Sequence, residues 1–363
     1  MRGISRVWPF ALVVLGAMTS AILLSALLIS IFSCESSFAA VVRLVGAFST
    51  VLCAIFFYAH YQARYGISIW LIIVALGIYT LVGAIQLFSP EFALQFVPLR
   101  TTSDRGVPSL AAEPTNFGIQ ILLLALMIWL HGSSRQRTIV LFGCLTIIEV
   151  FLTQSVSALL LGFSFLGVLA LRGRFAVVAV SLLLISALAL ISADAVKNGD
   201  ILGERTTKLL AMIAERGAID AALSDTSANT RIAHTILPWY ASFDSWALPQ
   251  ALGTFDSVTK PIRQDMGGLL LADTFTKIMS FAGVFIFHGG ILGLTLFGFI
   301  FWKVSQNFGL PFSLWFILLA VSAIPLSNPL MTFVLSALLL RADSDVLRVH
   351  GARLRIPKQS QTA

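Results

Sequence analysis

Two polar segments of an otherwise apolar chain hold most of the residues that could carry chemistry. In the first, Glu113 precedes Pro114 at the start of an apolar run, and Arg105 lies eight residues before Glu113. A carboxylate at such a position could accept the proton of a substrate hydroxyl, while a guanidinium could bind an anion. The alternative is structural, because the N-terminus of a helix favours a nearby negative charge. The residue types alone leave both interpretations of Glu113 open.

The second polar segment combines basic and aromatic residues. Arg231 and His234 are three residues apart, so on a helix both would project from one face. A guanidinium suits phosphate binding, and an imidazole can transfer a proton near neutral pH. Trp239 and Tyr240 follow, and aromatic rings among polar groups suit sugars, whose faces are apolar and whose edges are polar. The alternatives are a hydrogen-bonding surface histidine and an aromatic belt at a membrane interface.

Two further ionisable residues, Arg43 and Glu149, lie within apolar segments, where a charge is costly and often functional. Each is about one helical turn from the predicted outer end of its segment. Thr146 and Thr153 would share the helix face of Glu149, and such a polar stripe must face protein or water rather than lipid. Arg43 and Glu149 are therefore candidates for substrate binding, or they form an ion pair that only holds helices together.

The composition places these residues in a membrane protein. The chain has 363 residues, of which 58% are hydrophobic and 11% charged, and its mean hydropathy is +0.92. A soluble domain carries about a quarter charged residues, so an ordinary soluble enzyme and a disordered chain are excluded. The apolar runs are continuous and mostly about 15 to 25 residues long, which indicates helices rather than a membrane β-barrel. The net charge of +7 comes from basic residues scattered beside apolar runs, so no nucleic-acid partner is expected.

The order of apolar and basic segments predicts an all-α, polytopic membrane protein with about ten transmembrane helices. Short cytoplasmic loops are rich in arginine, and Arg135–Gln136–Arg137 precedes region 138–171 while Arg172–Gly173–Arg174 follows it. The chain must therefore cross twice between these two loops, with a turn around Gln154–Ser157. The predicted spans are 8–32, 39–59, 68–88, 117–131, 138–153, 158–171, 175–193, 280–302, 311–325 and 330–340.

This pattern predicts a single membrane domain, residues 1–363, with both termini in the cytoplasm. The C-terminal residues 341–363 would form a basic cytoplasmic tail. Two sizeable loops, 89–116 and 194–279, are predicted on the periplasmic side. Within the longer loop, residues 205–222 have the pattern of one amphipathic helix that lies on the membrane surface or caps a cavity.

Glycine and cysteine spacing points to packing rather than to chemistry. Gly289 and Gly293 are four residues apart in the predicted span 280–302, which predicts close contact with a neighbouring helix. The three cysteines have no metal-binding spacing, and no phosphate-binding loop or nucleophile motif occurs. The expectation is therefore a protein without a metal site.

The sequence resembles the bacterial O-antigen polymerase and ligase family, which includes exopolysaccharide-repeat polymerases. Four segments carry the resemblance, in the family's order, and the match covers roughly residues 100–300. They are similar to an Arg…Glu-Pro entry to a span, an LT-x-S-R-S/T-A/G-L segment, an S-x-x-x-R element of the large outer loop, and a glycine-rich span. In this chain the four segments are Arg105 with Glu113–Gly118, Leu152–Leu160, Ser227–Arg231 and Gly290–Leu294.

The resemblance implies a polymerase-type glycosyltransferase at the periplasmic face of the bacterial inner membrane. It would join undecaprenyl-diphosphate-linked oligosaccharide repeat units during O-antigen, capsule or exopolysaccharide synthesis, without a metal, a nucleotide or another cofactor. Arg105 and Arg231, together with Arg43, would bind the leaving diphosphate; Glu113 would be the first candidate for the base and His234 the second. Membrane lipids, a chain-length regulator and a flippase would be its partners.

Departures from the family pattern bear on which activity is expected. The His-Asn pair typical of ligases is missing before the glycine-rich span, which favours a polymerase over an O-antigen ligase, and Val156 stands where arginine is often seen. A polysaccharide flippase or transporter is a second alternative, but it would be expected to show broken helices in two corresponding halves. A non-catalytic assembly protein, whose charged loop residues bind a partner, is a third.

Overall fold

The described part of the chain is built from helices. In the computed structural model no strand occurs among the described residues, so the predicted all-α class is confirmed. The structure describes residues 10–33, 37–64, 66–89, 106–111, 113–132, 152–171, 204–267, 269–270, 275, 277–322 and 324–340. The helices are α1 (Phe10–Ser33), α2 (Phe38–Arg64), α3 (Ile69–Phe88), α5 (Pro114–His131), α7 (Val156–Leu171), α9 (Glu204–Arg216), α10 (Ala218–Ser224), α11 (Thr226–Asp244), α12 (Phe255–Asp265), α13 (Phe281–Gly289), α14 (Ile291–Val321) and a last helix, 329–340.

Several of these helices are suited to a membrane. Among the described residues, five helices are long and apolar enough to cross one, namely α1, α2, α3, α5 and α14. Helix α7 and the last helix are shorter but also apolar. These elements coincide with predicted spans, so the assignment to the membrane class is supported. Of the predicted spans 138–153 and 175–193, only Leu152 and Thr153 are among the described residues.

Helix α14 runs through the structure twice because its backbone breaks at Gly309, where φ is 74° and ψ is 163°. At its start, the amide of Ile291 donates to the carbonyl oxygen of Ala247 at 2.8 Å. At its end, the carbonyl oxygen of Val321 accepts from Thr235 Oγ1 at 3.1 Å. Thr235 and Ala247 are at most about 25 Å apart, from nine residues of helical rise to the end of α11 and three further residues of chain, whereas a straight helix of 31 residues would span about 46 Å. The chain therefore reverses direction at Gly309.

A second break divides what the sequence predicts as one continuous span, 280–302. Gly290 separates α13 from α14 with φ 52°, a left-handed conformation that favours glycine. A Cβ at Gly290 would collide with the carbonyl oxygen of Ala247, so the prediction of an unbroken helix is wrong here. Gly289 does lie against Ile22 of α1, as predicted, whereas Gly293 packs against the backbone of α13, which belongs to the same predicted span.

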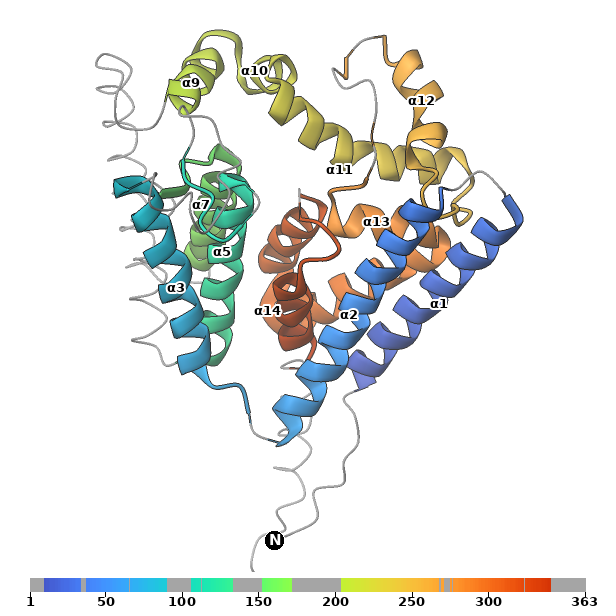
Figure 1. Cartoon of the computed structure of the whole chain (residues 1–363), viewed down its shortest axis with the longest axis horizontal. Helices are drawn as coiled ribbons and strands as arrows, with labels where there is room; N and C mark the ends of the chain where they lie inside the picture. Colours follow the sequence, from blue (N-terminus) through green and yellow to red (C-terminus); the bar gives the residue numbers. More distant parts are fainter. Residues whose placement is uncertain are drawn as a thin grey trace, which may run out of the picture.

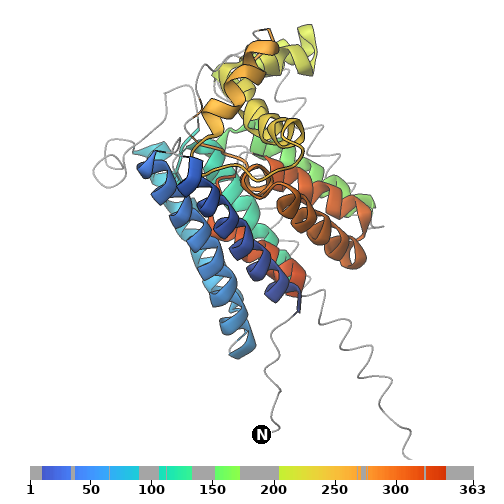
Figure 2. The same cartoon turned by 90° about the vertical axis from the view of Figure 1, so that its right-hand side faces the viewer.

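Helices α9 to α12 form a layer across one end of the membrane helices (Figures 1 and 2). All four come from the predicted outer loop 194–279. The single amphipathic helix predicted for 205–222 is instead two helices, α9 and α10, because Gly217 between them has φ 87°. Within this outer layer, α11 lies across the N-terminal ends of α5 and α7.

Helix α5 is the most enclosed of the candidate spans. Within an 18-residue window, 83% of α5 is buried, against 17% for α3, so α5 is central and α3 has an outer face free for lipid. Near the end of α5, the Trp129 ring meets Phe165 of α7 edge-on at 5.9 Å and stacks on Phe312 of α14 at 5.6 Å. This packing fixes the position of the helix and therefore of its N-terminus, beneath α11.

The substitution Gly290→Ala should strongly destabilise the protein, because alanine would need both a left-handed backbone and the space of the Ala247 carbonyl. Backbone strain of this kind costs about 1–3 kcal/mol, before the collision is added. The control is Gly298→Ala, since a Cβ at Gly298 would have open space around it. Thermal unfolding of the detergent-solubilised protein should show a lower midpoint for Gly290→Ala only. Equal midpoints for both variants would contradict the close approach at Gly290.

Candidate active site

Arg231 joins three helices through its guanidinium. From α11 it donates through Nη2 to Thr115 Oγ1 of α5 at 2.7 Å and through Nη1 to Ser157 Oγ of α7 at 3.1 Å. Ser155 Oγ donates to the same Thr115 oxygen at 3.0 Å. We call these four residues, together with Glu113, the Arg231 cluster. Residue type predicted roles for Arg231 and Glu113 only; Thr115, Ser155 and Ser157 lie inside two of the segments that resemble the family, but no role was predicted for them.

Glu113 is the acidic member of the cluster. Its Oε2 lies 3.9 Å from Arg231 Nη2, an ion pair beyond direct hydrogen-bond distance, and its side chain is 44% exposed. Glu113 is also the N-cap residue of α5, although within the described structure its carboxylate accepts no capping bond. The carboxylate does lie at the positive end of a helix, as the structural interpretation expects. Its half-exposed oxygens nevertheless remain accessible to a substrate hydroxyl.

A turn before α7 positions the hydroxyl groups of the cluster. Gln154 in this turn has φ 46°, and the turn lies where the sequence predicts one. The amide of Val107 donates to the carbonyl oxygen of Leu152 at 2.9 Å. Gly106 lies so close to the carbonyl of Thr153 that a Cβ would not fit there. The turn and the loop 106–111 are therefore packed together beside the N-terminus of α5.

The loop 106–111 is also anchored to α3. The Gln86 side chain accepts from the amide of Ser109 at 2.6 Å and donates to its carbonyl oxygen at 2.9 Å. Ser109 Oγ donates to the Tyr79 carbonyl oxygen at 2.6 Å. Arg105, which precedes this loop in the sequence and was predicted as a diphosphate ligand, lies outside the described residues. The anchored loop shows that this part of the predicted outer segment 89–116 has a fixed backbone next to the cluster.

Three of the four segments that carry the family resemblance meet at the Arg231 cluster: Glu113–Gly118, Leu152–Leu160 and Ser227–Arg231. The fourth segment, Gly290–Leu294, begins α14 beside Ala247, beyond the other end of α11. Comparisons with protein-family models, with curated proteins and with solved structures find no match.

His234 lies apart from the cluster. Its ring is only 4% exposed, packs edge-on against Phe275 at 4.8 Å and stacks on Phe255 of α12 at 6.3 Å. Burial, helped by the charge of Lys277, lowers the pKa of His234 to about 4. Residues three apart on a helix point about 60° away from each other, which is enough here for Arg231 to face α5 and α7 while His234 faces α12. The structure therefore does not bring His234 to Glu113.

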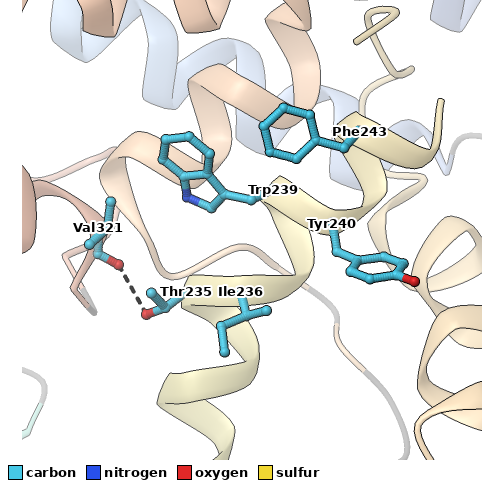
Figure 3. A pocket seen from close by; sticks show the side chains of 6 residues that line it. All are labelled: Thr235, Ile236, Trp239, Tyr240, Phe243 and Val321. Atoms are coloured by element: carbon cyan, nitrogen blue, oxygen red, sulfur yellow. Dashed lines mark hydrogen bonds between the residues drawn. The ribbon is translucent and has the colours of Figure 1, made fainter. Parts of the chain in front are cut away.

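Trp239 and Tyr240 line a groove along α11 with a volume of about 400 Å³ (Figure 3). The hydroxyl of Thr235, at one end of the groove, donates to the carbonyl oxygens of Arg231 and Val321 at 2.9 and 3.1 Å. Most of the remaining surface is hydrocarbon. The residues that line the groove are Thr235, Ile236, Trp239, Tyr240, Phe243 and Val321.

The remaining candidates are not part of the cluster. Arg43 is exposed and lies about one turn from the start of α2, a helix that does not contribute to the Arg231 cluster. Glu149 lies outside the described residues, so the proposed Arg43–Glu149 pair stays a prediction. In the part of the chain that the structure describes, no group of three His, Cys, Asp or Glu side chains could hold a metal ion.

Because His234 is buried in its neutral form, the packing of α11 against α12 should be sensitive to acid. In the unfolded chain a histidine titrates near pH 6.5, whereas folded His234 stays neutral down to about pH 4. The unfolded state takes up this proton first, so the stability should fall as the pH decreases from about 6.5 to 4. Thermal unfolding across this range should show the loss, and His234→Phe should remove it. The exposed His60 of α2 provides the control His60→Phe, which should keep it; identical pH profiles for His234→Phe and the wild type would contradict the assignment.

Proposed function

We propose that this protein is a glycosyltransferase of the O-antigen polymerase type. It joins oligosaccharide repeat units carried on undecaprenyl diphosphate, at the periplasmic face of the bacterial inner membrane. The proposal rests on the sequence resemblance and on the meeting of three of its segments in one place. An O-antigen ligase and a flippase are the alternatives that the experiments below distinguish.

The observation that supports the proposal best is the position of Arg231 beside Glu113. Arg231 comes from the outer layer and is held by hydroxyls of α5 and α7, at 2.7 and 3.1 Å. Glu113 lies 3.9 Å away and is 44% exposed. Transfer of a sugar from a lipid diphosphate needs a fixed cation for the leaving group and an acceptor for the proton of the attacking hydroxyl. Arg231 and Glu113 provide this combination at the end of a membrane helix.

In the proposed reaction, a hydroxyl oxygen of the acceptor repeat unit attacks the anomeric carbon of the donor sugar. The bond between that carbon and the diphosphate oxygen breaks, and its electron pair remains on the diphosphate. Arg231 stabilises the charge of the leaving diphosphate, with Arg105 as a second cation, and the N-terminus of α5 adds a partial positive charge. The proton of the hydroxyl passes to the carboxylate of Glu113.

The proposed topology has ten membrane-spanning helices, cytoplasmic termini and two periplasmic loops. Its support comes from positions far apart in the sequence that would all lie outside the membrane. Glu113 belongs to the loop 89–116, Ser155 to the predicted outer turn, and Arg231 to the loop 194–279. Their side chains meet in one cluster, as segments on the same side of the membrane can.

A tag inserted at Gly217, between α9 and α10, should be accessible from the periplasm in intact cells. Tags beside Arg135, in the Arg172–Gly173–Arg174 turn or at the C-terminus should not be, because short arginine-rich loops stay in the cytoplasm. The measurement is labelling by a reagent that does not cross the inner membrane. Labelling of the Arg172–Gly173–Arg174 tag in intact cells would contradict the ten-span topology.

Arg231→Lys and Glu113→Gln should both abolish polymer formation. Lysine keeps the charge of Arg231 but loses the planar fork that bridges Thr115 and Ser157, and loss of a fixed cation costs on the order of 10²-fold in rate. Glutamine cannot accept the proton, although the lipid-linked donor should still bind. Arg105→Lys should also fail, because arginine can bind a phosphate bidentately whereas lysine acts only as a point charge. Polymer length and single lipid-linked repeat units would be measured at matched membrane abundance.

The matched control is Arg263→Lys. Arg263 is an ion-paired arginine in the same outer layer, with Nη2 2.8 Å from Asp256 Oδ1, and it lies on α12 outside the cluster. This variant should keep polymer formation at matched abundance. Near-normal polymer from Glu113→Gln would exclude Glu113 as the base. Near-normal polymer from Arg231→Lys would exclude Arg231 as the residue that binds the diphosphate. Unattached long polymer in cells that lack the protein would indicate a ligase, and repeat units trapped at the cytoplasmic face would indicate a flippase.

A further inference from the structure

Four residues of α11 form a row that runs from a cation to aromatic rings. Arg231, Thr235, Trp239 and Phe243 follow each other at intervals of four, so their side chains form one ridge, which winds by about 120° around the helix from the first to the last. The row is about 18 Å long at the rise of an α-helix. At its first end the guanidinium contacts α5 and α7, and at its other end the rings of Trp239 and Phe243 lie 6.4 Å apart. One ridge of α11 therefore changes from cationic to apolar.

The groove beside the apolar end offers little to a sugar. The hydroxyl of Thr235 is used by two carbonyl oxygens, and Figure 3 shows the hydroxyl of Tyr240 directed away from the ring of Trp239. The side chains of Ile236, Phe243 and Val321 carry no polar atoms. A sugar placed here would leave most of its hydroxyls without partners, which is unfavourable, whereas a hydrocarbon chain has no such requirement.

The groove also lies where a membrane lipid can reach it. One wall is Val321, the last residue of α14, and α14 is a candidate membrane span. Phe243 is 62% exposed, Tyr240 51% and Ile236 47%. Adjacent exposed apolar side chains of this kind mark contact with a membrane or an apolar ligand.

We propose that this groove binds the prenyl chain of the lipid diphosphate, at the units next to the phosphates. The inference rests on the proposed function, which supplies the lipid diphosphate as substrate. Charge complementarity selects this occupant: the anionic diphosphate matches Arg231, and the hydrocarbon that follows it matches a groove beginning one helical turn further along α11. With the diphosphate at Arg231 and the chain in the groove, the donor sugar lies beside Glu113. Trp239 and Tyr240 thus contact the lipid rather than the sugar.

The test uses the purified full-length protein in lipid nanodiscs with a polyprenyl diphosphate that carries a diazirine in the isoprene unit nearest the phosphates. After illumination, mass spectrometry should find adducts on residues 235–243. Trp239→Ala should lower this labelling by about tenfold, since a large apolar contact is lost. Phe243→Ala, at an exposed position that tolerates truncation, should lower it as well. The matched control is Trp246→Ala. Trp246 is 91% exposed just beyond α11 and does not line the groove, so labelling of residues 235–243 in this variant should equal that of the wild type.

Adducts that lie outside both residues 235–243 and Val321 would overturn the proposal, as would undiminished labelling of both Trp239→Ala and Phe243→Ala. A second probe, phosphatidylglycerol with a diazirine in an acyl chain, tests the choice of lipid. Equal labelling of the groove by this probe would overturn the assignment to the prenyl chain. Polymer synthesis measured in the same nanodiscs separates the two proposals. If the groove is labelled but no polymer forms, the polymerase function is contradicted and prenyl-chain binding is not. If polymer forms but the groove is not labelled, prenyl-chain binding in the groove is contradicted and the polymerase function is not.

Discussion

The hydrogen bonds from Arg231 to Thr115 and Ser157 attach one end of α11 to α5, a candidate membrane span, and to the shorter apolar helix α7. A guanidinium between helices is unfavourable unless its donors find acceptors, so the bonds both satisfy the charge and fix where α11 lies. The side chains of Arg231 and Glu113 remain 24% and 44% exposed, which keeps the pair accessible to a ligand. Such a contact can stabilise the fold and also bind a substrate, because guanidinium N–H groups that are already fixed in place suit an anion.

The other end of α11 depends on backbone hydrogen bonds. The break at Gly290 leaves amide and carbonyl groups that a continuous helix would pair internally, and such groups are tolerated at membrane depth only when protein covers them. The segment after α11 covers them: Ile291 donates to Ala247 at 2.8 Å, and Gln250 donates to the Phe287 carbonyl at 3.2 Å. With a guanidinium at one end and a broken membrane helix at the other, the direction of α11 is fixed. The row from Arg231 to Phe243 is thereby oriented as well.

Much of the fold follows from the sequence because lipid demands long continuous apolar segments, and α1, α2, α3 and α5 lie within a few residues of their predicted ranges. The breaks at Gly217 and Gly290 do not follow, since glycine is also compatible with a helix and only the contact with Ala247 requires the turn at Gly290. At the site, residue type identified Glu113 and Arg231. The contacts of Thr115 and Ser157 with Arg231 could not be predicted, although both residues lie in segments that resemble the family, because they are 116 and 74 residues from Arg231 in the sequence. His234 shows the same limitation. Helical spacing predicts the direction in which its side chain points from α11, but not that α12 lies on that side.

The distance between Arg231 and Glu113 connects binding to chemistry under the proposed function. At 3.9 Å the two side chains neutralise each other's field without the short bond that would occupy the carboxylate fully. A diphosphate that binds Arg231 competes for this positive charge and adds negative charge beside Glu113. The guanidinium then pairs with the diphosphate, so the Glu113 oxygens can accept from the acceptor hydroxyl instead. Glu113 would therefore become a proton acceptor mainly when the donor lipid is in place, which makes transfer depend on both substrates being bound.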